Sequence, residues 1–206
     1  MNVLIVDDHP IVISGCRSML ADETDIEVVE AADGESGYQR YLATKPAVAV
    51  IDINLPGLSG LDLLRRILRH DPAARIIIFS MNDDPIFAAR AIEFGAKGFL
   101  PKSGDPARFV EALRTVAGDG VFLPPEMAQK LAFYNLSLRA SPLNDLSGRE
   151  LEILRLLGNG KSMADIADLI HVSYKTVANT CSILKRKLGA RTAMDLVRIA
   201  AEHQLV

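Results

Sequence analysis

The sequence predicts an α/β part with a doubly wound parallel sheet, followed by a smaller all-α part of four helices. Two observations predict this organisation. Within residues 1–120, five short β-branched apolar runs alternate with segments of helical periodicity, as is typical of β-α units in series. Residues 146–206 contain no β-rich run and carry helix start and stop signals instead.

The expected strands of the first part lie at residues 3–6, 26–29, 48–51, 76–79 and 98–100. Polar residues seldom interrupt these runs, as is required of strands that are buried on both faces. Between the runs, apolar side chains recur at helical spacing, as at Leu61, Leu64, Ile67 and Leu68. Right-handed crossovers between parallel strands then predict a doubly wound sheet, for which we expect the strand order 2-1-3-4-5.

Residues 121–145 are expected to form a linker that contains one short helix. The alternation of strands and helices stops there, and Pro124-Pro125 can start a helix that runs to about residue 133. Residues 141–144 have the composition of a turn. The chain is therefore divided into residues 1–120, 121–145 and 146–206.

The last segment is predicted to contain a helix-turn-helix. Ser147 and Glu150 form a capping box before the first helix, and glycines at 158 and 160 end it. The helices that follow are expected at about 163–170, 174–188 and 192–204, with a three-residue turn at 171–173. Two short helices joined by a tight turn have the geometry of this DNA-binding motif.

Charge is divided unevenly along the 206 residues. Residues 1–145 hold 14 basic and 20 acidic side chains, whereas residues 146–206 hold 9 basic and 6 acidic ones. An acidic part joined to a basic part suggests a different partner for each, although a solvated helix face explains a modest basic excess equally well.

Other features of the sequence limit the class of protein. No stretch approaches the roughly 20 apolar residues of a membrane span. Acidic residues follow the first apolar run directly, which argues against a signal peptide. Cys16 and Cys181 form no CxxC motif, so neither a disulfide framework nor a zinc ribbon is predicted. We expect a cytoplasmic protein with no membrane partner.

Polar and charged side chains follow most of the predicted strands. Asp7 and Asp8 follow the first strand, Asp52 the third, Ser80 the fourth and Lys102 the fifth. The carboxyl ends of the strands share one edge of a doubly wound sheet, where ligands bind. We therefore expect these five side chains to converge.

Three carboxylates at one edge repel one another unless a cation lies among them. Mg²⁺ suits such a site, because it prefers oxygen ligands and keeps waters that a phosphoryl group can replace. Asp52 is then the best-placed nucleophile toward phosphorus, with Lys102 and Ser80 to hold the phosphoryl oxygens. Taken singly, each acid also fits the role of a cap on the following helix.

These motifs resemble those of two known domain families. Residues 1–120 resemble a response-regulator receiver domain, which has a flavodoxin-like (βα)5 fold. The matching residues are Val6-Asp7-Asp8-His9-Pro10, Asp52, Leu55-Pro56-Gly57, Gly60, Ser80 and the run from Gly95 to Lys102. Residues 146–206 resemble a LuxR-type DNA-binding domain, in Leu146-Ser147, Arg149-Glu150, Ile166-Ala167, Thr176-Val177 and Leu184 to Gly189. Together they resemble a NarL/FixJ-type response regulator of a two-component system.

The resemblance implies a phosphoacceptor site in residues 1–120. Asp52 would accept a phosphoryl group from a sensor histidine kinase. Mg²⁺ would be held by Asp7, Asp8, Asp52 and the backbone carbonyl of Asn54. The receiver would catalyse only its own phosphorylation and dephosphorylation.

Further residues acquire roles from the same resemblance. Ser80 and Lys102 would bind the phosphoryl group, and Ser80 and Phe99 would form the switch. Core packing explains Phe99 equally well. His9 matches a feature of a subfamily, and it fits an exposed histidine at a helix start equally well.

The third helix of the last segment has two predicted faces. Its apolar residues Val177, Cys181, Leu184 and Leu188 recur at helical spacing and should pack inward. The residues expected to contact double-stranded DNA are Lys175, Thr176, Asn179, Ser182, Lys185 and Arg186. Asn179 can recognise adenine, whereas the basic side chains suit phosphates. The family often carries a lysine and a histidine where this chain has Ala178 and Thr180, so the family's target sequence is not carried over.

Three functions are compatible with these residues. The first is a phosphorylation-switched transcription factor that forms a homodimer and binds promoters once Asp52 is phosphorylated. The second is an aspartate-nucleophile phosphatase, but such hydrolases usually carry aspartate at the position that Asn54 occupies here. The third is a protein-interaction regulator without DNA binding, which Ala178 and Thr180 suggest.

Overall fold

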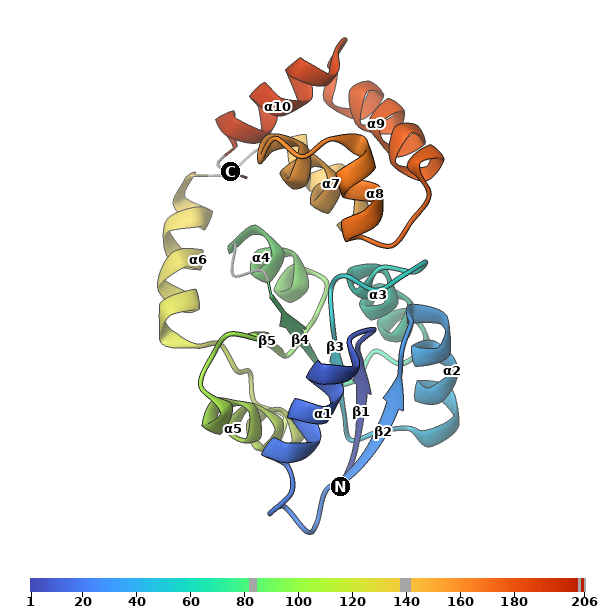
Figure 1. The fold of residues 1–206 in the computed structure, drawn as a ribbon. Helices are drawn as coiled ribbons and strands as arrows, with labels where there is room; N and C mark the ends of the chain where they lie inside the picture. The colour runs from blue at the N-terminus through green and yellow to red at the C-terminus, as the bar shows by residue number, and fades with distance from the viewer. Residues whose placement is uncertain (82–84, 138–141, 204, 206) are drawn as a thin grey trace. The chain divides into compact units, whose positions relative to one another are not determined.

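The computed structural model describes residues 1–81, 85–137, 142–203 and 205 (Figure 1). The chain forms two compact units, Met1–Tyr134 and Asn135–Val206, each with buried hydrophobic residues of its own. The segment limits expected at residues 120 and 145 stay predictions.

The first unit is built on five parallel strands in the order β2-β1-β3-β4-β5, which confirms the predicted class and strand order. β3 and β4 are buried along their whole length, as their sequences predict, since every residue of the two strands except Ser80 is apolar. β2 extends beyond the predicted 26–29, because it pairs with β1 as far as Ala31. The strands are β1 (Asn2–Val6), β2 (Glu27–Ala31), β3 (Val48–Ile51), β4 (Ile76–Ser80) and β5 (Gly98–Pro101).

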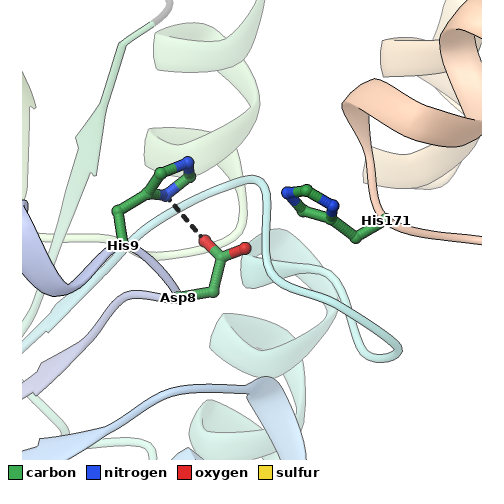
Figure 2. Close-up of side chains that lie close together, drawn as sticks. All are labelled: Asp8, His9 and His171. Atoms are coloured by element: carbon green, nitrogen blue, oxygen red, sulfur yellow. Dashed lines mark ion pairs between the residues drawn. The ribbon is translucent and has the colours of Figure 1, made fainter.

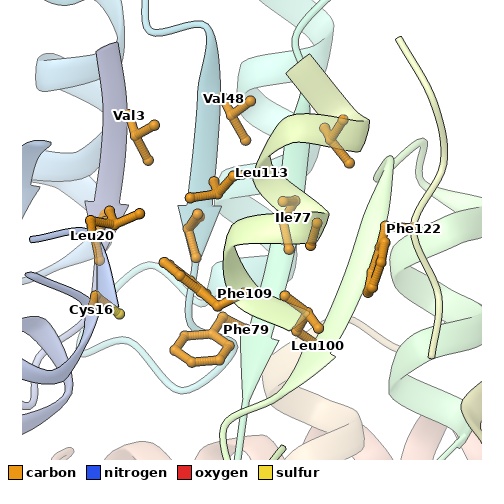
Figure 3. Packing of buried hydrophobic residues seen from close by; sticks show 14 residues of the cluster. Val3, Cys16, Leu20, Val48, Ile77, Phe79, Leu100, Phe109, Leu113 and Phe122 are labelled. Atoms are coloured by element: carbon orange, nitrogen blue, oxygen red, sulfur yellow. The ribbon is translucent and has the colours of Figure 1, made fainter. Parts of the chain in front are cut away.

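Helices cover both faces of this sheet: α1 (Pro10–Met19), α2 (Gly34–Thr44), α3 (Gly60–His70), α4 (Pro85–Glu93) and α5 (Pro106–Ala117). α1 packs against α5, while α3 packs against α2 and α4. The core beneath α1 and α5 includes Cys16 and two aromatic rings, Phe79 and Phe109, whose centroids are 5.3 Å apart (Figure 3). α6 (Pro125–Ser137) follows and is longer than the helix predicted to end near residue 133.

The register of the sheet brings the ends of β1 and β3 together. Val6 pairs with Ile51, and the N–H of Asp52 donates to the carbonyl oxygen of Val6 at 2.9 Å. Asp7 follows Val6 directly, so Asp7 and Asp52 leave the sheet side by side at its carboxyl edge.

The second unit is helical, as predicted, with η1 (Pro142–Asp145), α7 (Gly148–Gly158), α8 (Met163–Leu169), α9 (Tyr174–Leu188) and α10 (Ala193–Glu202). The capping box of Ser147 and Glu150 is confirmed, and further capping boxes start α8 at Ser162 and α10 at Thr192. α8 packs against α9 after a tight turn, which forms the helix-turn-helix.

Lys45 ends α2 in a left-handed conformation, with φ of 45° and ψ of 62°. This conformation crowds the Cβ of an ordinary residue but not glycine. We therefore expect Lys45→Gly to raise the free energy of unfolding by about 1 kcal/mol, whereas Lys45→Ala should leave it nearly unchanged. Thermal unfolding of the full chain measures both variants. Equal stability of the glycine and alanine variants would contradict backbone strain at this position.

Candidate functional site

Carboxylates and one ammonium group meet at the carboxyl edge of the sheet. Lys102 Nζ lies 2.6 Å from Asp7 Oδ2 and 3.0 Å from Asp52 Oδ2. The three side chains are no more than 3% exposed. Asp8 belongs to the same cluster, since ligand atoms of Asp7, Asp8, His9 and Asp52 all lie within 4.8 Å of one another. The structure thus brings together the charged residues that follow the first, third and fifth strands.

His9 lies against the same carboxylates. Its Nδ1 is 2.9 Å from Asp8 Oδ1 (Figure 2) and 3.3 Å from Asp7 Oδ1. The backbone N–H of His9 also donates to Asp7 Oδ1 at 3.0 Å. His9 is the N-cap residue of α1, so the short turn from β1 into α1 places its ring beside the acids. The sequence alone is compatible both with a subfamily feature at His9 and with an exposed histidine at a helix start.

Burial raises the pKa of the Asp52 carboxyl from 3.8 to about 6. Lost hydration is the largest cause of this rise, and the negative charge of Asp7 adds to it, whereas Lys102 acts in the opposite direction. At neutral pH Asp52 is therefore an ionised carboxylate with little hydration. The free energy of such a carboxylate falls when it binds a cation or forms a bond to an electrophile.

Gly60 allows α3 to begin directly against the backbone of Asp52. A Cβ at position 60 would lie 1.8 Å from the carbonyl oxygen of Asp52 and 2.9 Å from Ile53 Cα. The N–H of Gly60 donates to the Ile53 carbonyl at 2.8 Å. Glycine is required here because the two backbones approach too closely for a side chain, and their contact holds the segment that carries Asp52.

We expect Gly60→Ala to lower the free energy of unfolding by at least about 3 kcal/mol, because backbone atoms must move to admit the methyl group. Gly15→Ala is the matched control, since a Cβ at position 15 in α1 meets nothing within 4 Å. This control should raise stability by about 0.5–1 kcal/mol. Urea denaturation of the full chain measures both, and a Gly60→Ala variant as stable as Gly15→Ala would contradict the tight contact.

The other expected site residues of the first unit lie in the sheet or directly after one of its strands. Ser80 is fully buried at the end of β4, and the N–H of Lys102 donates to its carbonyl oxygen at 2.7 Å. Asn54 is half-buried in the segment after β3. Phe99 is fully buried in β5, which agrees with core packing, and its part in a switch stays a prediction.

Glu30 of β2 pairs with Arg17 of α1. The contact joins residues that are distant in the sequence, so spacing alone could not predict it.

In the second unit, Lys187 Nζ lies 2.7 Å from Glu150 Oε2 and donates to the Asp145 carbonyl at 3.0 Å. Lys187 therefore ties α9 to the start of α7.

α9 of the second unit has the two faces that its sequence predicts. Val177, Cys181 and Leu184 are buried, and Leu188 is half-buried. Of the residues expected to contact DNA, Lys185 is half-buried, and the exposed ones are Lys175, Thr176, Asn179, Ser182 and Arg186. α9 thus presents hydroxyl, amide and basic groups along one side, and their contacts with DNA stay predictions.

Among the helices of the described residues, none is long and apolar enough to cross a membrane.

Two family patterns match the chain. The response regulator receiver domain matches residues 3–114, and the bacterial regulatory proteins of the LuxR family match residues 144–200.

Similar proteins extend over nearly the whole chain. Methanol utilization control regulatory protein MoxX of Paracoccus denitrificans is 36% identical, over 96% of this chain and 89% of its own. Oxygen regulatory protein NreC of Staphylococcus carnosus is 34% identical, over 100% of this chain and 99% of its own. The solved structure of RcsB from Salmonella enterica serovar Typhimurium, bound to promoter rprA, is 28% identical with a TM-score of 0.65 and covers 98% of both chains. The chain therefore belongs to the NarL/FixJ-type response regulators, which join a receiver domain to a LuxR-type DNA-binding domain.

Proposed function

We propose that Asp52 accepts a phosphoryl group from a sensor histidine kinase, and that this phosphorylation controls dimerisation and promoter binding. The observation that carries the proposal is the buried cluster in which Lys102 contacts both Asp7 and Asp52. The structure of RcsB on promoter rprA, obtained in the presence of the phosphomimetic BeF3-, gives further support. We assign the phosphoryl chemistry to residues 1–120 and DNA binding to residues 146–206, joined by the linker 121–145.

The oxygen donors of the cluster fit a hard divalent cation. The carboxylates of Asp7, Asp8 and Asp52 lie close enough for one ion to contact all three, and Lys102 offsets only part of their charge. These carboxylates and the backbone carbonyl of Asn54 would hold Mg²⁺. When bound, the ion supplies positive charge that offsets the negative charge of a phosphoryl group.

Asp52 supplies the nucleophile of the transfer. A carboxylate oxygen of Asp52 forms a bond to phosphorus while the bond from phosphorus to the donor's nitrogen or oxygen breaks, and the donor keeps that electron pair. Lys102 lies 3.0 Å from Asp52, so its ammonium group is placed to stabilise the phosphoryl oxygens, and Ser80 can donate a hydrogen bond to one of them. Hydrolysis reverses the change when water attacks phosphorus and Asp52 leaves as a carboxylate. The receiver thereby catalyses its own phosphorylation and dephosphorylation.

Acetyl phosphate tests this chemistry without a kinase. Incubation of the full chain with acetyl phosphate and Mg²⁺ should add one phosphoryl group, and mass spectrometry of the intact chain should detect it. EDTA should prevent the addition, because the crowded carboxylates need a cation before a phosphoryl group can approach. Equal phosphorylation with and without EDTA would contradict the assigned role of the carboxylates.

The second unit would bind double-stranded DNA through the exposed side of α9. Asn179 lies on this side and can recognise adenine in the major groove. Lys175, Lys185 and Arg186 would contact phosphates, with Thr176 near the helix N-terminus and Ser182 further along. Thr180 uses its hydroxyl within α9, where it donates to the Thr176 carbonyl at 2.9 Å. Thr180 also carries no positive charge, so it does not replace the basic contact that the family often has nearby.

Two substitutions separate base recognition from phosphate binding. Asn179→Ala should cost about 1–3 kcal/mol of binding at a selected site and little on unrelated DNA. Lys185→Ala should weaken binding to all sequences alike and reduce the dependence of affinity on salt. Fluorescence anisotropy with selected and scrambled duplexes measures both effects. Equal binding of wild type and Asn179→Ala to the selected duplex would remove Asn179 from base recognition.

Dimerisation would follow from phosphorylation and would strengthen DNA binding. One helix-turn-helix covers a small site, so two copies on paired half-sites bind better because the second contact is effectively intramolecular. Analytical ultracentrifugation of the phosphorylated chain tests the dimer. Because a kinase and DNA are its proposed partners, we propose that the chain acts in the cytoplasm.

A further inference from the structure

The proposed cation site has a nitrogen donor besides its carboxylates. His9 Nδ1 lies 2.9 Å from Asp8 Oδ1 (Figure 2) and 3.3 Å from Asp7 Oδ1. Together with the carboxylates of Asp7, Asp8 and Asp52, it forms a group of four donors within 4.8 Å of one another.

The two oxygens of Asp7 face different partners. Oδ2 meets the ammonium group of Lys102 at 2.6 Å, whereas Oδ1 accepts a hydrogen bond from the backbone N–H of His9 and lies near its ring. Lys102 is buried, but the His9 side chain is 50% exposed. The His9 side of the cluster is therefore the side that an ion from solvent reaches first.

We infer that His9 is a nitrogen ligand of the proposed cation site and shifts its preference from Mg²⁺ toward transition-metal ions such as Co²⁺. The inference rests on the cation site of the proposed function. His9 would then determine which ions can compete with Mg²⁺ for the proposed cation site.

Ligand chemistry supports this role. Mg²⁺ gains little from an imidazole, whereas first-row transition ions bind nitrogen ligands well and increasingly so along the series toward copper. When the ring proton is on Nε2, the Nδ1 atom of His9 carries a free lone pair. This lone pair lies beside Asp8 Oδ1, so both atoms can bind the same ion. The ring is half exposed, so an ion can reach it from solvent without the movement of a buried group.

The test compares two ions on three forms of the full chain at one pH above neutrality. Isothermal titration calorimetry measures the dissociation constants of Mg²⁺ and Co²⁺ for wild type, His9→Gln and His70→Gln. His70 ends α3 and is exposed, so His70→Gln serves as the matched control. We expect His9→Gln to weaken Co²⁺ binding about tenfold and Mg²⁺ binding less than about twofold. His70→Gln should change neither.

A second measurement needs no variant. Zn²⁺ is a diamagnetic ion that also binds imidazole nitrogen, so on binding wild type it should shift the 15N NMR signal of Nδ1 in one of the four histidines of the chain, and that histidine should be His9. Equal loss of affinity for Co²⁺ and Mg²⁺ in His9→Gln, or an unshifted His9 Nδ1 in the Zn²⁺ complex, would overturn the ligand role while leaving the Mg²⁺ site intact. Failure of wild type to bind Mg²⁺ at all would instead overturn the proposed cation site, and the inference with it.

Discussion

Asp52→Asn should abolish phosphorylation by acetyl phosphate and remove every effect of the phosphodonor on DNA affinity. A neutral amide is a poor nucleophile, so the variant cannot form the acyl phosphate. Lys102 keeps its contact with Asp7 Oδ2 at 2.6 Å, so part of the buried cluster is retained. Phosphate-affinity electrophoresis of the full chain measures the loss.

Asp22→Asn is the matched control, since Asp22 is an exposed acid outside the cluster. This variant should be phosphorylated like wild type. Phosphorylation of Asp52→Asn to the wild-type extent would show that a different residue accepts the phosphoryl group.

Asp52→Asn should also stabilise the chain at neutral pH in the absence of divalent ions. Burial holds the pKa of Asp52 near 6 in the folded chain against an ordinary value of 3.8, a difference worth about 3 kcal/mol. The folded chain binds this proton more tightly than the unfolded chain does. The free-energy cost of burying the ionised carboxylate is therefore absent below about pH 4, where Asp52 is protonated in both states. It grows as the pH rises and is fully present above about pH 6.

The comparison of wild type with Asp52→Asn isolates this contribution. Helix-cap hydrogen bonds lower the pKa values of three other acids, Asp33, Asp165 and Asp195. These acids stabilise the folded chain when ionised, and this contribution is lost as the pH falls. The loss is the same in wild type and in the variant, so it cancels in the comparison. Urea denaturation in EDTA should show the variant more stable at pH 7 by up to about 3 kcal/mol and equal to wild type near pH 4. A difference that does not depend on pH would mean that Asp52 titrates normally. Mg²⁺ should stabilise wild type more than the variant.

Much of the fold and of the site follows from local sequence. Parallel strands must end at one edge, so the positions of Asp7, Asp52 and Lys102 at the ends of apolar runs were enough to predict their convergence. Helix capping at Ser147 and the inward stripe of α9 are likewise local patterns.

Other features depend on contacts between distant segments. The bridging of Asp7 and Asp52 by Lys102 depends on the spacing of β1, β3 and β5, which no sequence pattern gives. The requirement for glycine at Gly60 comes from its approach to the backbone of Asp52, whereas in the sequence Gly60 is only one residue of a motif. His9 was undecided, because the path of the chain from β1 into α1 determines whether its ring lies on the acids.

The central claim is that phosphorylation of Asp52 controls DNA binding by the same chain. Its most direct test is a titration of full-length protein, with and without acetyl phosphate and Mg²⁺, against a duplex that the chain selects from random DNA. Analytical ultracentrifugation of the same samples reports the dimer. We predict that phosphorylation tightens binding by about 5-fold to 150-fold, the usual range of coupling between two sites, and increases the dimer population. A chain that stays monomeric and binds the duplex equally tightly in both states would contradict the claim.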